Sequence, residues 1–177
     1  EHIATKHVSL DIQPAQYSIV GENLLHSISE VLDVPFESDL IEAWKQAYLQ
    51  LADILIGAEQ QKYDQLASQS GGWSGWRNFK IVSIEDHAEG KFFNIRAADQ
   101  QTIPTAQAGE YISVKVHVPE KGIDQPQQFS FSSTQDTAQY SFLVKSQAEH
   151  SEYDVANILL SHYQVGDELA VSAPLKG

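Results

Sequence analysis

The sequence predicts an α+β chain in which a helical N-terminal part precedes a small antiparallel sheet, closed or nearly closed into a barrel. Apolar residues recur at steps of three and four in the first part, as on one face of a helix. The cluster Ser70-Gly71-Gly72 breaks this pattern. Beyond it, apolar and polar residues alternate, as in half-buried strands. We therefore expect two parts, residues 1–70 and residues 71–177.

The helical part predicts two long helices. Pro14 suits the first position of a helix, because its missing N–H would have no partner there. Ser38 and Asp39 offer capping oxygens for a second helix, and Glu42 follows Asp39 at the spacing of a capping box. This helix is expected to reach Leu66. The apolar stripe of the first helix comprises Val20, Leu24, Ile28, Val31 and Leu32.

The second part predicts six strands with turn-rich stretches between them, of which 99–109 and 119–126 are the longest. One helix is expected over 155–163, before the last strand. Short antiparallel strands with a single late helix are typical of a small barrel. The expected strands are 79–84, 91–97, 112–118, 128–132, 140–145 and 168–172.

The net charge and the lack of cysteine exclude several functional classes of protein. The net charge of −13 argues against binding to nucleic acid or to anionic membrane surfaces, and no apolar run is long enough to span a bilayer. The absence of Cys excludes disulfides, thiolate metal sites and a cysteine nucleophile. We expect a cytoplasmic protein. Because the chain also lacks Met, we expect it to be a fragment of a longer protein.

One candidate site lies in the helical part. His7, at the end of a short helical segment, could bind a metal or haem iron through a neutral imidazole nitrogen. A lone histidine is more often a packing or surface residue. Tyr17 and Glu59 could orient the imidazole if the three side chains converge, which their spacing does not establish. Taken singly, Tyr17 would be a helix-face aromatic and Glu59 a solvated charge.

A second candidate site lies in the β part, where Tyr111 and residues 127–130 stand near the ends of successive strands. Their aromatic rings could stack on a flavin, and Ser130 could form a hydrogen bond with it. Barrel core and ordinary surface are the alternative for these residues. The sequence has no GxGxxG, P-loop, HExxH or GxSxG motif.

Several motifs occur in a fixed order along the chain: KHVSL with IQPAQYSIVGENLL, GGWSGWRNF, GEYISV and VGDELAVSAP. In this respect the chain resembles the bacterial flavohaemoproteins, which join a globin to a flavin reductase and oxidise nitric oxide to nitrate. The resemblance implies that residues 1–70 are the C-terminal part of a globin. It implies that residues 71–177 are a six-stranded Greek-key barrel of the ferredoxin-reductase type, which binds FAD.

The resemblance also implies roles for individual residues. His7 matches the axial ligand of haem b, and Tyr17 and Glu59 match the catalytic residues that strengthen it as an electron donor. Electrons would pass from NAD(P)H to FAD and then to haem, with oxygen and nitric oxide as substrates. The residues that match flavin-binding motifs are Tyr111, Gln127, Gln128, Phe129, Ser130, Val155, Ala156 and Asn157.

The chain departs from the family pattern at the phosphate end of the flavin site. The Arg of the RxYS motif is replaced by Gln127, which carries no charge. In the GxVSN motif, Tyr153 replaces the Gly and Ala156 the Ser, and Asp154 adds a negative charge. Each change is expected to weaken the binding of FAD.

Two hypotheses follow. The first is a flavohaemoprotein-like oxidoreductase fragment that lacks the distal half of the globin and the NAD-binding domain. The alternative is a non-enzymatic relic or protein-interaction module that has lost FAD and haem. Incomplete cover of the helices would also leave apolar surface exposed and favour self-association.

Overall fold

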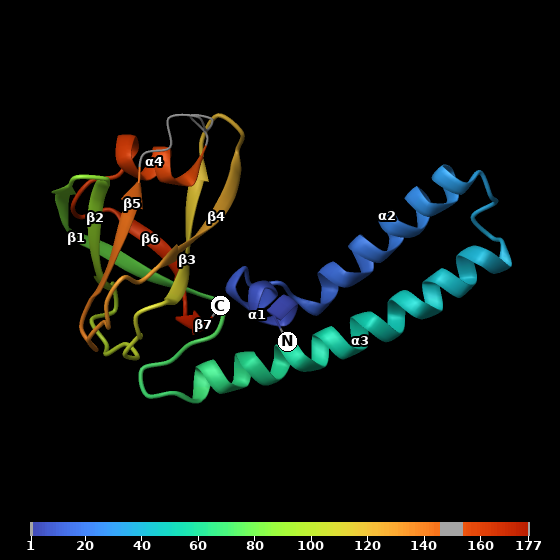
Figure 1. Cartoon of the computed structure of the whole chain (residues 1–177), viewed down its shortest axis with the longest axis horizontal. Helices are drawn as coiled ribbons and strands as arrows, with labels where there is room; N and C mark the ends of the chain where they lie inside the picture. Colours follow the sequence, from blue (N-terminus) through green and yellow to red (C-terminus); the bar gives the residue numbers. More distant parts are fainter. Residues whose placement is uncertain (1, 146–153, 177) are drawn as a thin grey trace.

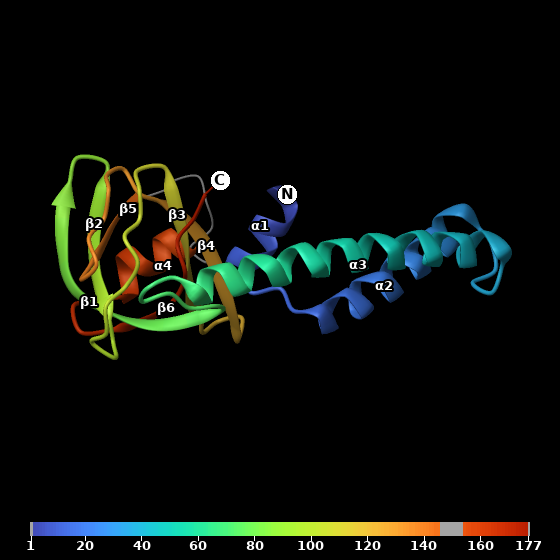
Figure 2. The same ribbon diagram turned by 90° about the horizontal axis from the view of Figure 1, so that it is seen from below.

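Three helices precede the sheet in the computed structural model, which describes residues 2–145 and 154–176. The short helix α1 spans His2–Ser9, and the long helices α2 and α3 span Pro14–Leu32 and Asp39–Ser68. Helices α2 and α3 lie side by side and project from the barrel as an arm (Figures 1 and 2). The prediction of two long helices, preceded by a short helical segment that carries His7, is confirmed.

The ends of the long helices follow from their local sequence. Pro14 stands at the start of α2 as expected, and Asp33 ends this helix in the left-handed conformation with φ 51°. Ser38 caps α3 by accepting a hydrogen bond from the N–H of Ile41 at 3.4 Å. The helix therefore begins with a serine cap, and the expected pairing of Asp39 with Glu42 is not what caps it.

The described strands form one antiparallel sheet in the order β4-β3-β6-β1-β2-β5, with β7 beside β3. The sheet curls, so that its end strands β4 and β5 approach each other, and helix α4 contacts both of them (Figure 1). This is the predicted nearly closed barrel with one late helix. The elements are β1 Trp76–His87, β2 Gly90–Ala97, β3 Glu110–Val118, β4 Ile123–Ser130, β5 Tyr140–Lys145, α4 Val155–His162, β6 Glu168–Ser172 and β7 Leu175–Lys176.

The predicted bounds of β4 were wrong. The strand was expected at 128–132 after a long turn, but it begins at Ile123 and pairs with β3 along its whole length. Pro126 sits opposite Lys115 within this pairing, which an end strand tolerates because one of its sides needs no ladder hydrogen bond. The two-residue strand β7 was also missed, since two residues carry no alternation to detect.

One hydrophobic core runs through the barrel and into the base of the arm. Trp73 is buried in it, and its indole N–H donates to the carbonyl oxygen of Val171 at 3.1 Å. Val8, Tyr63 and Leu66 bring α1 and the end of α3 into the same cluster. Helix α1 and the C-terminal turns of α3 are therefore packed on the barrel.

The outer part of the arm is different, because large apolar side chains are exposed along α2 and α3. Val31 is 83% exposed and Ile54 is 68% exposed, and Ile19, Leu24 and Trp44 are also exposed. No helix within residues 2–145 and 154–176 is long and apolar enough to cross a membrane. Exposed apolar side chains gathered along two helices mark a surface that another protein segment or a ligand can cover.

Candidate functional site

The structure brings His7, Tyr17 and Glu59 together from three different helices. The imidazole Nδ1 of His7 lies 2.7 Å from Oε1 of Glu59 and 3.0 Å from the hydroxyl of Tyr17. The Tyr17 hydroxyl donates to the same Glu59 oxygen at 2.5 Å. Tyr17 and Glu59 lie 10 and 52 residues after His7 in the sequence, yet all three side chains share one hydrogen-bonded cluster.

This geometry fixes the chemistry of the imidazole. Because a carboxylate can only accept, Glu59 accepts from the Nδ1–H of His7, which leaves Nε2 as the ring nitrogen that can bind a metal. The His7 side chain is 32% exposed, so a ligand can reach it. A neutral imidazole oriented by a carboxylate is the usual arrangement of a metal-binding histidine.

The carboxylate of Glu59 is buried. Its side chain is 2% exposed, and its second oxygen, Oε2, has no hydrogen-bond partner among the described residues. Burial, followed by the hydrogen bond to Glu59, raises the pKa of the Tyr17 hydroxyl above its ordinary value, so Tyr17 remains a proton donor. Both donors therefore point at one buried oxygen.

Two further tyrosines hold this cluster in place. The Tyr63 hydroxyl donates to the carbonyl oxygen of Ile12 at 3.0 Å, in the loop between α1 and α2. The Tyr48 hydroxyl donates to the carbonyl oxygen of Tyr17 at 2.6 Å. Helix α3 thus fixes both segments that carry the partners of Glu59.

Of the residues proposed to bind flavin, 127–130 lie on β4 and alternate between its two faces. Tyr111 of β3 lies directly opposite Ser130, and Gln128 is on the same face two residues away. The side-chain amide of Gln128 donates to Ser9 Oγ at 2.8 Å, two residues after His7. Burial raises the pKa of the Tyr111 hydroxyl, and a side-chain hydrogen bond with Ser9 opposes that rise.

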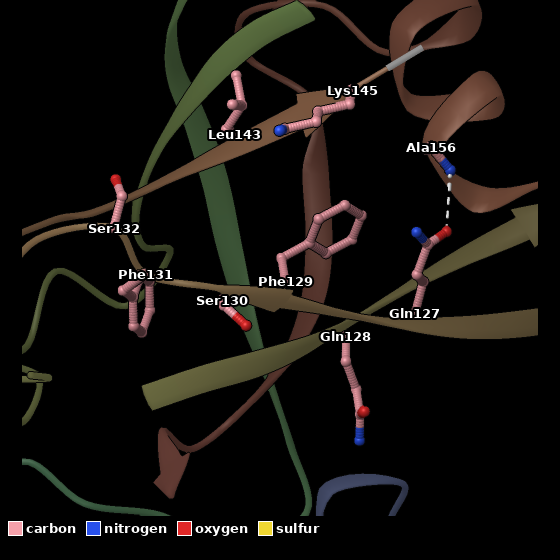
Figure 3. A pocket seen from close by; sticks show the side chains of 9 residues that line it. All are labelled: Gln127, Gln128, Phe129, Ser130, Phe131, Ser132, Leu143, Lys145 and Ala156. Atoms are coloured by element: carbon pink, nitrogen blue, oxygen red, sulfur yellow. Dashed lines mark hydrogen bonds between the residues drawn. The ribbon is translucent and has the colours of Figure 1, made fainter. Parts of the chain in front are cut away.

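Gln127 and Phe129 face the other way, into a cleft of about 390 Å³ between β4, β5 and the start of α4 (Figure 3). Phe129 is 6% exposed and packs on Phe142 with ring centroids 5.0 Å apart, which leaves a small part of its ring for a ligand. The described residues that line the cleft are Gln127, Gln128, Phe129, Ser130, Phe131, Ser132, Leu143, Lys145 and Ala156.

The first turn of α4 closes one end of this cleft. The N–H of Ala156 donates to Oε1 of Gln127 at 3.2 Å, the dashed line in Figure 3, and also to Oδ1 of Asp154 at 2.9 Å. Val155 and Ala156 are buried and Asn157 is partly exposed, whereas Tyr153 lies outside the described residues. The residues present therefore fit the ring of a flavin and not its phosphates, because the amide that would bind an anion already has two acceptors.

Ser9 and Lys145 take part in the site, although nothing in the sequence pattern singles them out. Ser9 is fully buried where α1 meets β4, a contact between residues 119 positions apart in the chain. Lys145 ends a strand and is an ordinary solvent-facing lysine in the alternating pattern. Only the closure of the barrel brings Lys145 to the cleft.

The arrangement defines a class of fold: a globin-type helical segment joined to a barrel of the kind found in FAD-dependent reductases. Residues 1–55 match the Globin family model. Flavohemoglobin from Malassezia yamatoensis, solved with FAD and heme, superposes with a TM-score of 0.83 at 27% identity, over 99% of this chain and 43% of that one. The flavohem-like FAD/NAD-binding domain of a Vibrio cholerae nitric oxide dioxygenase shares the barrel fold, with a TM-score of 0.53 at 24% identity over 57% of this chain and 44% of that one.

The chain is similar to flavohaemoproteins along nearly its whole length. It is 44% identical to a flavohemoprotein of Bordetella pertussis over 98% of its own length, and 35% identical to one of Bacillus subtilis over 98%. It spans 44% and 43% of the lengths of these two relatives. These similarities favour a flavohaemoprotein-like oxidoreductase over the interaction module that the sequence left open.

Proposed function

We propose that this chain carries the axial haem ligand and the flavin-ring site of a flavohaemoprotein oxidoreductase. The supporting observation is the 2.7 Å hydrogen bond from His7 Nδ1 to the buried carboxylate of Glu59. In this proposal residues 1–70 are the C-terminal part of a globin and residues 71–177 the flavin-binding barrel. The parent activity is nitric oxide dioxygenation in the cytoplasm.

His7 would hold haem b through Nε2, and the bound haem would supply the redox-active, oxygen-binding iron. Glu59 and Tyr17 would act through His7: the carboxylate holds the proton on Nδ1, and the phenol fixes the carboxylate. Negative charge on the far side of an imidazole strengthens its donation to a metal. This is the expected setting of an iron that must pass electrons to oxygen.

Tyr111 and Ser130 would bind the polar edge of the flavin from one face of β4, while Phe129 would contact its ring from the cleft. The bond from Gln128 to Ser9 joins the flavin strand to the helix that carries His7. The flavin and the haem would therefore lie close to this bond, a suitable arrangement for electron transfer.

We propose that the exposed apolar side chains of α2 and α3 are covered in the complete protein by haem and by the remaining globin helices. A nicotinamide-binding domain would complete the path from NAD(P)H. In the isolated chain the same surface would favour self-association.

A haem titration tests the proposal. The chain should bind haem with the Soret band of a histidine-ligated iron, and His7→Ala should abolish that spectrum. His2→Ala is the matched control, because His2 starts the same helix and has no link to Glu59. An unchanged Soret band in His7→Ala would disprove the assignment of the ligand.

A further inference from the structure

We infer that the cleft between β4 and β5 selects the ring of a flavin against its phosphates, so that it binds riboflavin at least as tightly as FAD. The inference rests on the proposed function for the flavin, and it adds the part of the cofactor that this chain recognises. Three features of the cleft support it.

The first feature is the start of α4. A free helix N-terminus favours an anion, because its first N–H groups lack partners. Here the N–H of Ala156 is shared between the carboxylate of Asp154 and the amide oxygen of Gln127. A phosphate could reach this N–H only by displacing both acceptors, and the carboxylate would repel it.

The second feature is the charge at the cleft. Of the described residues that line it, Lys145 alone is positively charged, and its ammonium is paired with the carboxylate of Glu89. That hydrogen bond lowers the pKa of Glu89, which keeps Glu89 ionised as the counter-charge. The described lining therefore offers the two phosphates of FAD no cation that lacks a counter-charge.

The third feature is the set of side chains in the cleft that can contact a flavin ring. Phe129 and Leu143 provide apolar walls, and Ser132 provides a hydroxyl. Neutral polar groups with apolar walls are typical of sites for flat heteroaromatic ligands, and about 390 Å³ lies in the range of such sites. A tricyclic flavin ring fits this chemistry without any contribution from phosphate.

The inference is tested by titrating the purified chain with lumiflavin, riboflavin, FMN and FAD. Binding is measured as the quenching of flavin fluorescence. Riboflavin should bind as tightly as FAD or more tightly, and salt should not weaken its binding. FAD binding about tenfold tighter than riboflavin would overturn the inference. So would the failure of all four flavins to bind, and the haem titration would then still decide the assignment of His7 independently.

A gain-of-binding variant sharpens the test. Gln127→Arg combined with Asp154→Asn supplies a cation and removes the carboxylate, while asparagine keeps the helix cap. The ratio of FAD affinity to riboflavin affinity should then rise about tenfold at low salt and return to its original value at high salt. Gln125→Arg is the control, since it adds the same charge to the same strand outside the cleft lining. Equal gains for riboflavin and FAD, or no gain for FAD, would contradict the inference.

Discussion

At the scale of single residues, the notable feature is a buried carboxylate with one partnered and one unpartnered oxygen. Removing a carboxylate from water costs several kcal/mol unless donors compensate. Two donors, His7 and Tyr17, converge on Oε1 of Glu59, while Oε2 has none among the described residues. An arrangement that costs stability in this way is better explained by its effect on the imidazole than by folding.

Replacing Glu59 with Gln tests that explanation. The amide keeps the shape and can still accept from Nδ1, but it removes the negative charge behind the ring. In the haem-loaded ferrous protein, the iron–histidine stretching vibration measured by resonance Raman should shift to lower frequency. Glu42→Gln is the control, because Glu42 is exposed on the same helix. An identical vibration in Glu59→Gln would show that the carboxylate does not tune His7.

The sequence could nominate His7, Tyr17 and Glu59 only through family resemblance. Hydrogen bonds depend on tenths of an ångström, and spacing along the chain does not fix the distance between helices. The sequence does not predict the hydrogen bonds that hold these residues in place. Tyr48 donates to the carbonyl oxygen of Tyr17, and Gln128 donates to Ser9 Oγ.

At the scale of elements, the close approach of α2 and α3 depends on one glycine. A Cβ built on Gly21 would lie 2.4 Å from Cε1 of Tyr48. The ring cannot move away easily, because the Tyr48 hydroxyl is hydrogen-bonded to the carbonyl oxygen of Tyr17. The glycine therefore sets the distance between the helices and, through Tyr17, the position of the phenol beside Glu59.

Gly21→Ala should destabilise the chain by about 1–2 kcal/mol, because the steric clash exceeds the gain in helix propensity. The matched control is Gly57→Ala, at an exposed helical position of α3 where a Cβ would meet nothing within 4 Å. That change should stabilise by about 0.5–1 kcal/mol. Urea unfolding of the two variants measures both values. Stabilisation by Gly21→Ala would show that the helices can separate without cost.

Element prediction succeeded where one periodicity persisted over many residues, as in α2, α3 and the alternating strand β3. It failed at the start of β4, where Ile123-Asp124-Gln125-Pro126 has the composition of a turn. Pairing with β3 overrides that composition, since tertiary hydrogen bonds and the burial of β3 favour the extended backbone. Strand propensity alone carries no information about such a partner.

At the scale of the whole molecule, the two parts of the chain are joined by packing and by a small polar contact. Ser9 accepts from Gln128 and donates to the carbonyl oxygen of Lys6 at 2.7 Å, all on the side of α1 that faces the barrel. Buried hydrogen bonds of this kind fix an orientation more than they add stability. The joint therefore holds the helix of His7 against the flavin strand.

Gln128→Ala should cost about 1 kcal/mol in the free energy of unfolding, since it removes one partly buried hydrogen bond. It should also increase amide hydrogen exchange in α1, because that helix loses its contact with β4. Gln125→Ala is the control on the same strand, away from α1. Unchanged exchange in α1 would show that the apolar contacts of Val8 alone fix the joint.

The free energy of unfolding of the whole chain should fall at alkaline pH, because two of its tyrosines are buried. Burial raises the pKa of Tyr63 and of Tyr140 above the ordinary value of 10.0, and their hydroxyls donate to the carbonyl oxygens of Ile12 and Pro104. Below pH 10 both residues are protonated in either state, so they add no pH dependence.

Above pH 10 the unfolded chain releases these protons and the folded chain keeps them, so the free energy of unfolding should fall by about 1.4 kcal/mol per pH unit for each buried tyrosine. Urea midpoints measured between about pH 9 and pH 11 report the slope, and tyrosinate absorbance should appear together with unfolding. Lysines also titrate in this range, so the decisive comparison is with Tyr140→Phe, whose slope should be shallower than that of the parent chain. Equal slopes would mean that Tyr140 ionises in the folded protein, against its burial and its bond to Pro104.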